Sequence, residues 1–405
     1  MYRSIDEIIR VEGGQVVATL CRMTGQLDLA EDAFSEAALE AVRRWPHDGL
    51  PANPGAWLTT VARRKALDML RRESQRPRRE EAATALSNAP VELELHTVRD
   101  DQLRLIFTCC HPSLTRESQV ALTLRIVCGL TTAEIAAAFF SPEPTMGKRI
   151  TRAKDKLRAN RIEFRIPPDE ELPGRLAAVL SVVELVFGAG HHTPVGPALT
   201  RVDLAEEGVR LARLLAELMP DEPECHGLLA MVLSMQARLP TRSDADGELV
   251  RLADADRSQW HHELTQEAIG ILERVLRAGR PGPFQLRAAI SCLHSVAPSA
   301  EQTDWAQIVQ LYDMLQARTP TVVVATNRAI AVAELDGPQA ALDALDVWAG
   351  DPDAERWHLF HAARADMLDR LSRPADARSA LEAALALPLN EPDERLLRRR
   401  LAALR

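Results

Sequence analysis

The sequence predicts an all-α protein built of two small helical domains and a helical repeat domain. Apolar residues recur at helical spacing along the chain, and no segment shows the alternating pattern of a half-buried strand. Proline and glycine punctuate these helical runs. Alanine and leucine are frequent, whereas aromatic residues make up only 4% of the 405 residues. This composition suits helices that pack closely through small side chains.

The first domain is predicted over residues 1–76, with amphipathic helices at 29–42 and 56–72. The segment 45–55 between them is rich in turn residues, so we expect no helix to cross it. Asn53 followed by Pro54 is a plausible start for the second helix. Residues 77–98 show weaker periodicity and are predicted to form a linker.

A second small helical domain is predicted over residues 99–165, and helix pairs follow one another over 166–405. The last two pairs, 327–335 with 338–348 and 357–371 with 374–387, close at prolines 36 residues apart. This period is near the roughly 34 residues of tetratricopeptide repeats. The segment 239–258 interrupts the series. Its aspartates lack the spacing of an EF-hand, so we predict an acidic surface loop.

Charge is distributed unevenly between the two parts of the chain. Residues 1–165 carry 25 Lys and Arg against 22 Asp and Glu, whereas residues 166–405 carry 24 against 36. The front is therefore weakly basic and the back strongly acidic. This asymmetry indicates that the front approaches a polyanion, and it favours an intramolecular contact between the two parts.

The six cysteines form no CxxC pair, and we expect buried thiols in a reducing compartment. Cys109, Cys110 and His111 would suit a metal or redox site, but that interpretation is the weaker one. No signal peptide is expected, because residues 1–13 already contain three acidic side chains. The most apolar stretch, 176–187, contains Glu184 and is too short to span a bilayer. We therefore expect a soluble, cytoplasmic protein without membrane contact.

A cationic run follows Trp57 in the first domain. Residues 63–79 contain eight basic residues against Asp68 and Glu73, whereas a solvated helix face usually mixes signs. An aromatic side chain beside phosphate-binding cations suits separated or single-stranded nucleic acid. The predicted contacts are Trp57, Arg63, Arg64, Lys65, Arg71 and Arg72.

A helix-turn-helix motif is predicted in the second domain. A short helix begins near Thr131 or Thr132 with Glu134 placed to reinforce its start, a turn follows at 141–144, and a basic helix covers 145–158. In such motifs the second helix enters the major groove and its N-terminal residues contact base edges. The predicted DNA contacts are Thr145, Lys148, Arg149, Arg152 and Lys154.

These motifs, in this order, resemble the extracytoplasmic-function sigma factors. Residues 30–37 (AEDAFSEA) are similar to region 2.2, residues 53–58 (NPGAWL) with 62–72 to regions 2.3 and 2.4, and residues 120–158 to region 4. The stretch 101–112 (DQLRLIFTCCHP) resembles a subgroup of large sigma factors with a C-terminal tetratricopeptide-like domain, as do 219–224 and 256–260.

The resemblance implies core RNA polymerase and promoter DNA as partners. Region 2 would bind the polymerase β′ clamp through Glu31, Asp32, Phe34 and Glu36. The basic helix near Trp57 would contact the −10 element, and region 4 would contact the −35 element and the β flap. No cofactor, metal or catalytic residue is implied, and no HExxH motif or phosphate-binding glycine loop is present in the sequence.

The C-terminal repeats would inhibit or support this activity, and a required role is slightly favoured because the subgroup motifs continue into them. The main alternative is a helix-turn-helix regulator with a tetratricopeptide-like sensor domain. That alternative assigns no purpose to the basic unit around Trp57.

Overall fold

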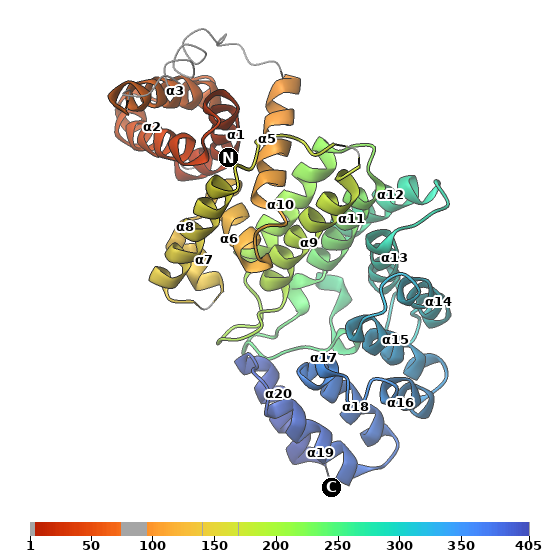
Figure 1. Cartoon of the computed structure of the whole chain (residues 1–405). Coiled ribbons are helices and arrows are strands. Elements are labelled where there is room, and N and C mark those ends of the chain that lie inside the picture. Colours follow the sequence, from red (N-terminus) through yellow and green to blue (C-terminus); the bar gives the residue numbers. More distant parts are fainter. Residues whose placement is uncertain (1–4, 74–94, 140, 169, 405) are drawn as a thin grey trace. The chain divides into compact units, whose positions relative to one another are not determined.

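A computed structural model describes residues 5–73, 95–139, 141–168 and 170–404 (Figure 1). Helices are the regular secondary structure of these ranges, which also hold two isolated β-bridges and no strand, and this confirms the all-α prediction for this part of the chain. The chain forms two compact units, Met1–Leu185 and Val186–Arg405.

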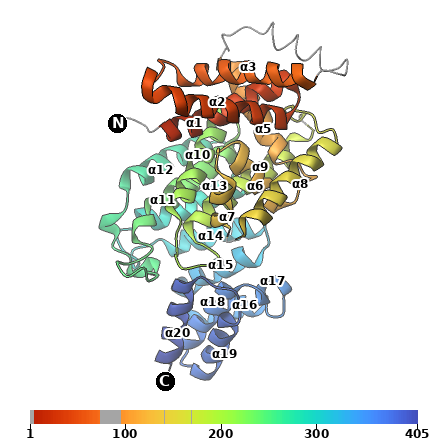
Figure 2. The same cartoon turned by 90° about the vertical axis from the view of Figure 1, so that its left-hand side faces the viewer.

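Three helices form the first part of unit 1: α1 (Ile5–Thr24), α2 (Leu27–Asp48) and α3 (Pro54–Glu73). They pack against one another and run side by side (Figure 2). The buried positions recur at three- and four-residue spacing, as an amphipathic helix requires. In α2 and α3 they include Ala33, Ala37, Ala41, Leu58, Ala62, Ala66 and Leu70.

The helix α2 extends further than the sequence predicts. It passes through Trp45 and Pro46 and ends at Asp48, so α2 occupies the first four residues of the predicted loop, although no helix crosses 45–55. Trp45 is buried and meets Trp57 edge to face at 5.3 Å between ring centroids, which stabilises this last turn. Pro46 removes one backbone donor but its fixed φ fits a helix. The predicted start at Pro54 is confirmed, and the Asn53 side chain accepts the Ala56 N–H at 3.0 Å.

Four further helices follow in unit 1: α5 (Leu95–Cys109), α6 (Arg116–Ile126), α7 (Thr132–Ala138) and α8 (Glu143–Ala159). The start of α5 lies inside the predicted 77–98 linker, whose residues 77–94 lie outside the described ranges. Asp101 in α5 is fully buried and binds Arg22 of α1 at 2.7 Å and Arg104 at 2.8 Å. This carboxylate ties α5 to α1.

The boundary between the units falls within α9 (Leu172–His191). By length and composition alone, this is the one helix in the described ranges that could cross a membrane. The apolar stretch 176–187 is part of a longer helix that extends beyond it at both ends, and only the whole helix reaches that length. Its apolar residues Val179, Val182, Val186 and Phe187 are buried in the protein, as in a core helix.

Unit 2 consists of successive helices: α10 (Val202–Leu218), α11 (Pro223–Ala237), α12 (His262–Leu276), α13 (Pro283–Val296), α14 (Trp305–Gln316), α15 (Val322–Leu335), α16 (Pro338–Asp346), α17 (Pro352–Glu355), α18 (His358–Arg370), α19 (Pro374–Leu385) and α20 (Glu391–Ala403). The predicted pairs correspond to α10 with α11, α12 with α13, α15 with α16, and α18 with α19. The sequence did not indicate α14, α17 or α20. Segment 239–258 forms a loop with three short 3-10 turns.

The six cysteines, which all lie in described ranges, are buried and form no disulfide. Burial raises the pKa of the Cys110 thiol to about 11, and the pKa of the Cys109 thiol is also raised by burial. His111 is occupied locally, because its Nδ1 accepts the Ser113 N–H at 3.1 Å. The expectation of buried thiols is confirmed, and these side chains do not converge on a common ligand.

Candidate promoter and polymerase interface

Local sequence fixes the helix-turn-helix. The Thr131 hydroxyl accepts the Glu134 N–H at 3.1 Å, and the Glu134 carboxylate accepts the Thr131 N–H at 2.7 Å. This reciprocal capping box sets the start of α7, as the sequence predicts. The pKa of Glu134 is held below its usual value, because hydrogen bonds from Thr131 and the Arg10 cation outweigh the opposing effect of burial.

The second helix of the motif, α8, presents a polar face and an apolar face. Met146, Ile150, Ala153 and Leu157 are buried, as predicted. Successive residues turn by about 100° along a helix, so four of the predicted contacts share an arc of about 100°. Their side chains are exposed or, for Arg149, half-buried: Thr145, Lys148, Arg149 and Arg152. This face is available to the major groove.

Lys154 does not lie on that face. It follows Thr145 by nine residues, which turns its side chain about 180° away. The Lys154 ammonium is instead paired with the carboxylate of Glu31 in α2. The structure therefore separates Lys154 from the other predicted −35 contacts, and the helical spacing of the sequence already implied this separation.

Glu31 is correspondingly separated from the other predicted polymerase contacts. It is buried, and its carboxylate also accepts Arg125 Nε at 2.9 Å. Asp28, one turn earlier in α2, is paired with Arg158 of α8. Asp32 and Glu36 are exposed and Phe34 is half-buried. The structure thus leaves three of the four predicted polymerase contacts accessible.

An apolar cavity adjoins these accessible residues. It has a volume of about 410 Å³ and is lined by Ile9, Phe34, Leu39, Val42 and other side chains of α1, α2 and α6. Leu39 is 58% exposed and Val42 is 46% exposed. Exposed apolar side chains around a hollow are typical of a protein-binding surface. Leu39 and Val42 are not among the contacts predicted from the sequence, although they follow Ser35 at the spacing that places residues on one face of a helix.

The basic helix α3 faces α2 with part of its charge. Arg64 Nη2 lies 3.2 Å from Glu40, and Lys65 Nζ lies 3.3 Å from Glu36 and 3.4 Å from Glu40. Burial opposes ionisation of Glu40, but Arg64, Lys65 and Arg44 outweigh it and hold its pKa below the usual value. Lys65, predicted to bind the −10 element, therefore contacts Glu36, predicted to bind polymerase.

The other residues predicted to contact the −10 element also belong to α3. Trp57 is half-buried against Trp45, so its indole is partly accessible for stacking. Arg63 is half-buried and Arg71 is exposed. The Arg72 side chain lies outside the described residues. The structure thus brings an accessible aromatic ring and several cations to one helix, as the sequence predicts.

Comparison with known proteins agrees with this geometry. Residues 8–76 match sigma-70 region 2, residues 104–157 match sigma-70 region 4, and residues 175–276 match a family of unknown function. The fold and these two regions define a sigma-70-type transcription initiation factor. An uncharacterized protein of Rhizobium meliloti (strain 1021) is 40% identical over 396 residues, covering 96% of this chain and 92% of that protein. No solved structure matches the chain. The chain belongs to the same family as the Rhizobium protein and is an extracytoplasmic-function-like sigma factor with an additional C-terminal domain.

Proposed function

We infer that the chain directs core RNA polymerase to promoters through two separate DNA contacts, and that it acts in the cytoplasm without catalysis of its own. The single observation that carries this inference is the exposed face of α8, where Thr145, Lys148, Arg149 and Arg152 share one arc of a capped helix-turn-helix. The cation-bearing helix α3, with Trp57 partly accessible, supports a second contact at the −10 element.

At the −10 element, Trp57 would stack on an unpaired base while Arg63 and Arg71 approach the strand's phosphates. Stacking on an aromatic ring stabilises an exposed base by about 1–3 kcal/mol, which offsets the cost of unstacking it. Joining this contact to α8 in one chain raises the effective concentration of the second contact once the first has formed.

Polymerase binding is assigned to the exposed side of α2. Asp32 and Glu36 supply charge, and Phe34, Leu39 and Val42 supply apolar surface beside the 410 Å³ cavity. This combination of charged and apolar surface on α2 fits the polymerase β′ clamp. The helix α8 would approach the polymerase β flap while α8 is bound to DNA. The ion pairs of Glu31 and Asp28 hold the opposite side of α8 against α2, so they leave the exposed arc of α8 and the exposed side of α2 uncovered.

The defining experiment combines the purified full-length chain with core RNA polymerase and a library of promoter fragments. We expect initiation at defined start sites that core polymerase alone does not use. Binding to a duplex operator in the absence of polymerase, with no stimulation of initiation, would instead identify a helix-turn-helix regulator. Arg356→Ala, at the exposed residue that follows α17, serves as the matched control for arginine substitutions in α3 and α8.

For unit 2 we propose a supporting or regulatory role. Its strong acidic excess favours contact with the basic front of the chain. Shortening the chain after residue 167 would remove α9 as well, whose Arg175 donates to the Phe107 carbonyl at 2.7 Å within unit 1. The informative shortened chain therefore ends after Leu185, at the unit boundary. Lost initiation would indicate a required role, and increased initiation would indicate inhibition.

A further inference from the structure

Three arginines of unit 2 converge where the loop after α11 packs on α13. Arg238 Nη2 donates to the Ser291 hydroxyl at 3.0 Å. Arg257 Nη1 donates to the carbonyls of His294 at 2.8 Å and Ala297 at 2.6 Å. Arg242 Nη2 contacts His192 Nδ1 at 2.8 Å. Each of these acceptors is neutral: a hydroxyl, two carbonyls and an imidazole nitrogen.

Burial and mutual repulsion act on these cations. Burial, followed by the charges of Arg242 and Arg257, lowers the pKa of Arg238 to about 10. Burial, followed by Arg238 and Arg257, lowers the pKa of His294 to about 3, so this imidazole is neutral at pH 7. Tyr312, which also acts on Arg238, has a pKa raised by burial to about 12 and carries no charge either.

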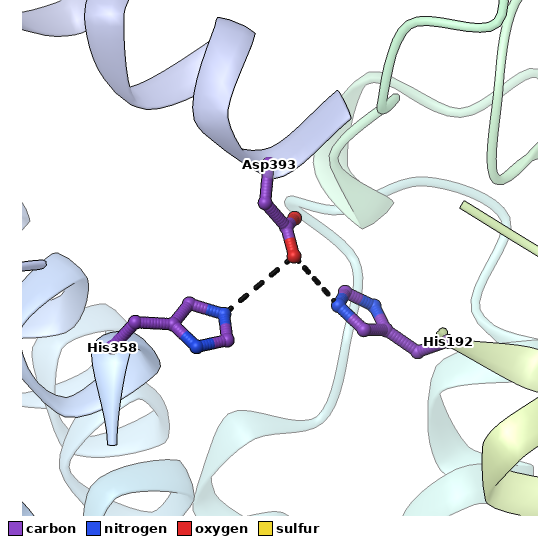
Figure 3. Close-up of side chains that lie close together, drawn as sticks. All are labelled: His192, His358 and Asp393. Atoms are coloured by element: carbon purple, nitrogen blue, oxygen red, sulfur yellow. Dashed lines mark hydrogen bonds and ion pairs between the residues drawn. The ribbon is translucent and has the colours of Figure 1, made fainter. Parts of the chain in front are cut away.

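Arg257 and Arg242 have structural roles that account for their positions. Arg257 ties the C-terminal end of α13 and lies over the Trp260 ring at 4.8 Å, a cation–π contact. Arg242 begins a chain of contacts that reaches α20. His192 Nε2 lies 2.8 Å from the Asp393 carboxylate (Figure 3). Asn390 Nδ2 donates to the same oxygen at 2.9 Å.

The group of His192, His358 and Asp393 has the composition of a metal site, since its ligand atoms lie within 4.8 Å of one another. The hydrogen bonding disfavours that interpretation. Arg242 can only donate, so His192 Nδ1 accepts, and the ring proton sits on Nε2, facing Asp393. Histidines that bind metals usually donate from the second nitrogen to an acceptor, the reverse of this arrangement. Asp393 is therefore committed to His192 and Asn390.

Arg238 is left without such compensation. Among the described residues, no carboxylate is paired with it, and the strongest charge acting on it is a further cation, Arg242. Arg242 has an unused donor, because its Nε is buried with no hydrogen-bond partner in the described part of the chain. Buried charges are normally paired, since an unpaired one is costly. The charge of Asp393 acts on Arg242, but no carboxylate accepts a hydrogen bond from either guanidinium group among the described residues.

We propose that Arg238 and Arg242 bind a small oxyanion, namely the phosphate or carboxylate group of a small molecule. The planar fork of a guanidinium matches the two oxygens of either group, and charge-assisted bonds of this kind are the strong ones. The Ser291 hydroxyl, which donates to Ser234 at 3.0 Å, accepts from Arg238 at 3.0 Å and so orients its guanidinium group. The site lies wholly in unit 2 and is independent of the promoter contacts, so it would supply unit 2 with a chemical signal to sense.

The first test measures binding of inorganic phosphate and of succinate to the full-length protein by calorimetry, with chloride at equal ionic strength as the reference. We expect saturable binding that Arg238→Gln weakens at least about tenfold, the loss of one charge-assisted contact. Arg328→Gln, which removes an arginine paired with Asp313 at 2.6 Å in the same unit, should leave the affinity unchanged. Tighter binding of phosphate than of succinate assigns a phosphate ligand, and the reverse assigns a carboxylate.

A second variant keeps the test decisive if Arg238→Gln folds poorly. Arg238→Met retains the apolar stem and removes the charge, so in buffer free of oxyanions it should raise the unfolding midpoint by about 2–4 °C. Phosphate should raise the midpoint of the natural protein and not that of the variant. Absence of binding by the natural protein would overturn the proposal. It would also be overturned if the Arg238→Met midpoint lay below that of the natural protein by the same amount with and without phosphate.

Discussion

Glu31 of α2 and Lys154 of α8 form an ion pair, so the helix predicted to bind polymerase is held by the helix predicted to bind the −35 element. Arg125 shares the same carboxylate at 2.9 Å, and Asp28 is paired with Arg158 nearby. All of these residues lie within unit 1. The pairing explains why Lys154 faces away from the exposed DNA-binding arc.

Replacing Lys154 with Gln should therefore affect stability more than promoter choice. The Glu31 side chain is only 11% exposed, and in the variant Arg125 alone would neutralise it, so we expect the free energy of unfolding to fall by about 1–2 kcal/mol. Urea denaturation measures this loss. Preference among −35 sequences should change by less than about twofold, since Lys154 is turned about 180° from Thr145. A change confined to particular −35 sequences would contradict this placement and return Lys154 to the DNA face.

Arg149 should behave in the opposite way. It lies in the second turn of α8 on the exposed arc, where a guanidinium can contact a base edge. Arg149→Ala should weaken recognition of promoters that carry one particular −35 base pair by about 1–3 kcal/mol of binding free energy, and initiation at these promoters should fall accordingly. Initiation at other promoters should be nearly unaffected.

The matched variant for Arg149 is Lys156→Ala, which removes an exposed cation nearer the C-terminal end of α8. A phosphate contact at that position would weaken binding on all sequences and reduce the salt dependence by about one counterion. Competitive initiation assays on a −35 library distinguish the two. Equal losses on every sequence for Arg149→Ala would show that it contacts phosphate only.

Local signals explain what the sequence could predict. The Thr131–Glu134 capping box, the Asn53–Pro54 helix start and the apolar spacing from Met146 to Leu157 depend on neighbours within a few residues. Each is therefore encoded by short-range spacing and matches the structure. The same holds for the cations of α3, whose helix the sequence located to within a few residues.

Contacts between distant residues could not be predicted in this way. Lys154 lies 123 residues from Glu31, and no local pattern indicates which acid a given cation meets. The continuation of α2 past Pro46 depends on burial of Trp45 against Trp57, which is a tertiary contact. The Asp393 contacts with His192 join segments 201 residues apart, on a helix that the sequence did not indicate.

Asp393 should make the stability of unit 2 depend on pH. Burial alone would raise the pKa of its carboxyl, but hydrogen bonds and charges from His192 and His358 hold it well below the usual 3.8. An acid with a lower pKa in the folded chain than in the unfolded chain stabilises the fold above its ordinary pKa. This contribution is lost as the pH falls below about 3.8.

Asp393→Asn should accordingly lower the free energy of unfolding at pH 7 by about 1–3 kcal/mol, and the difference from the natural protein should shrink at pH 3. Urea denaturation at the two pH values measures both effects. Asp366→Asn is the control, because Asp366 belongs to a half-buried pair with Arg400 at 2.9 Å that is more exposed than Asp393, and its loss should cost less than about 1 kcal/mol. A deficit for Asp393→Asn that persists unchanged at pH 3 would show that lost packing, and not charge, is responsible.

Two glycines of α9 should differ sharply in their tolerance of a methyl group. A Cβ at Gly190 would lie 2.2 Å from Ala205 N and 2.7 Å from the Arg201 carbonyl, both backbone atoms at the start of α10. A Cβ at Gly188 would meet nothing within 4 Å. Gly190 therefore permits the close approach of the two backbones.

Gly190→Ala should force them apart and lower the free energy of unfolding of the full-length protein by about 1–3 kcal/mol. Gly188→Ala, two residues earlier in the same helix, should be neutral or stabilise the protein by up to about 1 kcal/mol through helix propensity. Thermal and urea denaturation of the two variants side by side measure this difference. Equal effects would mean that α10 does not pack on α9 as closely as the structure places it.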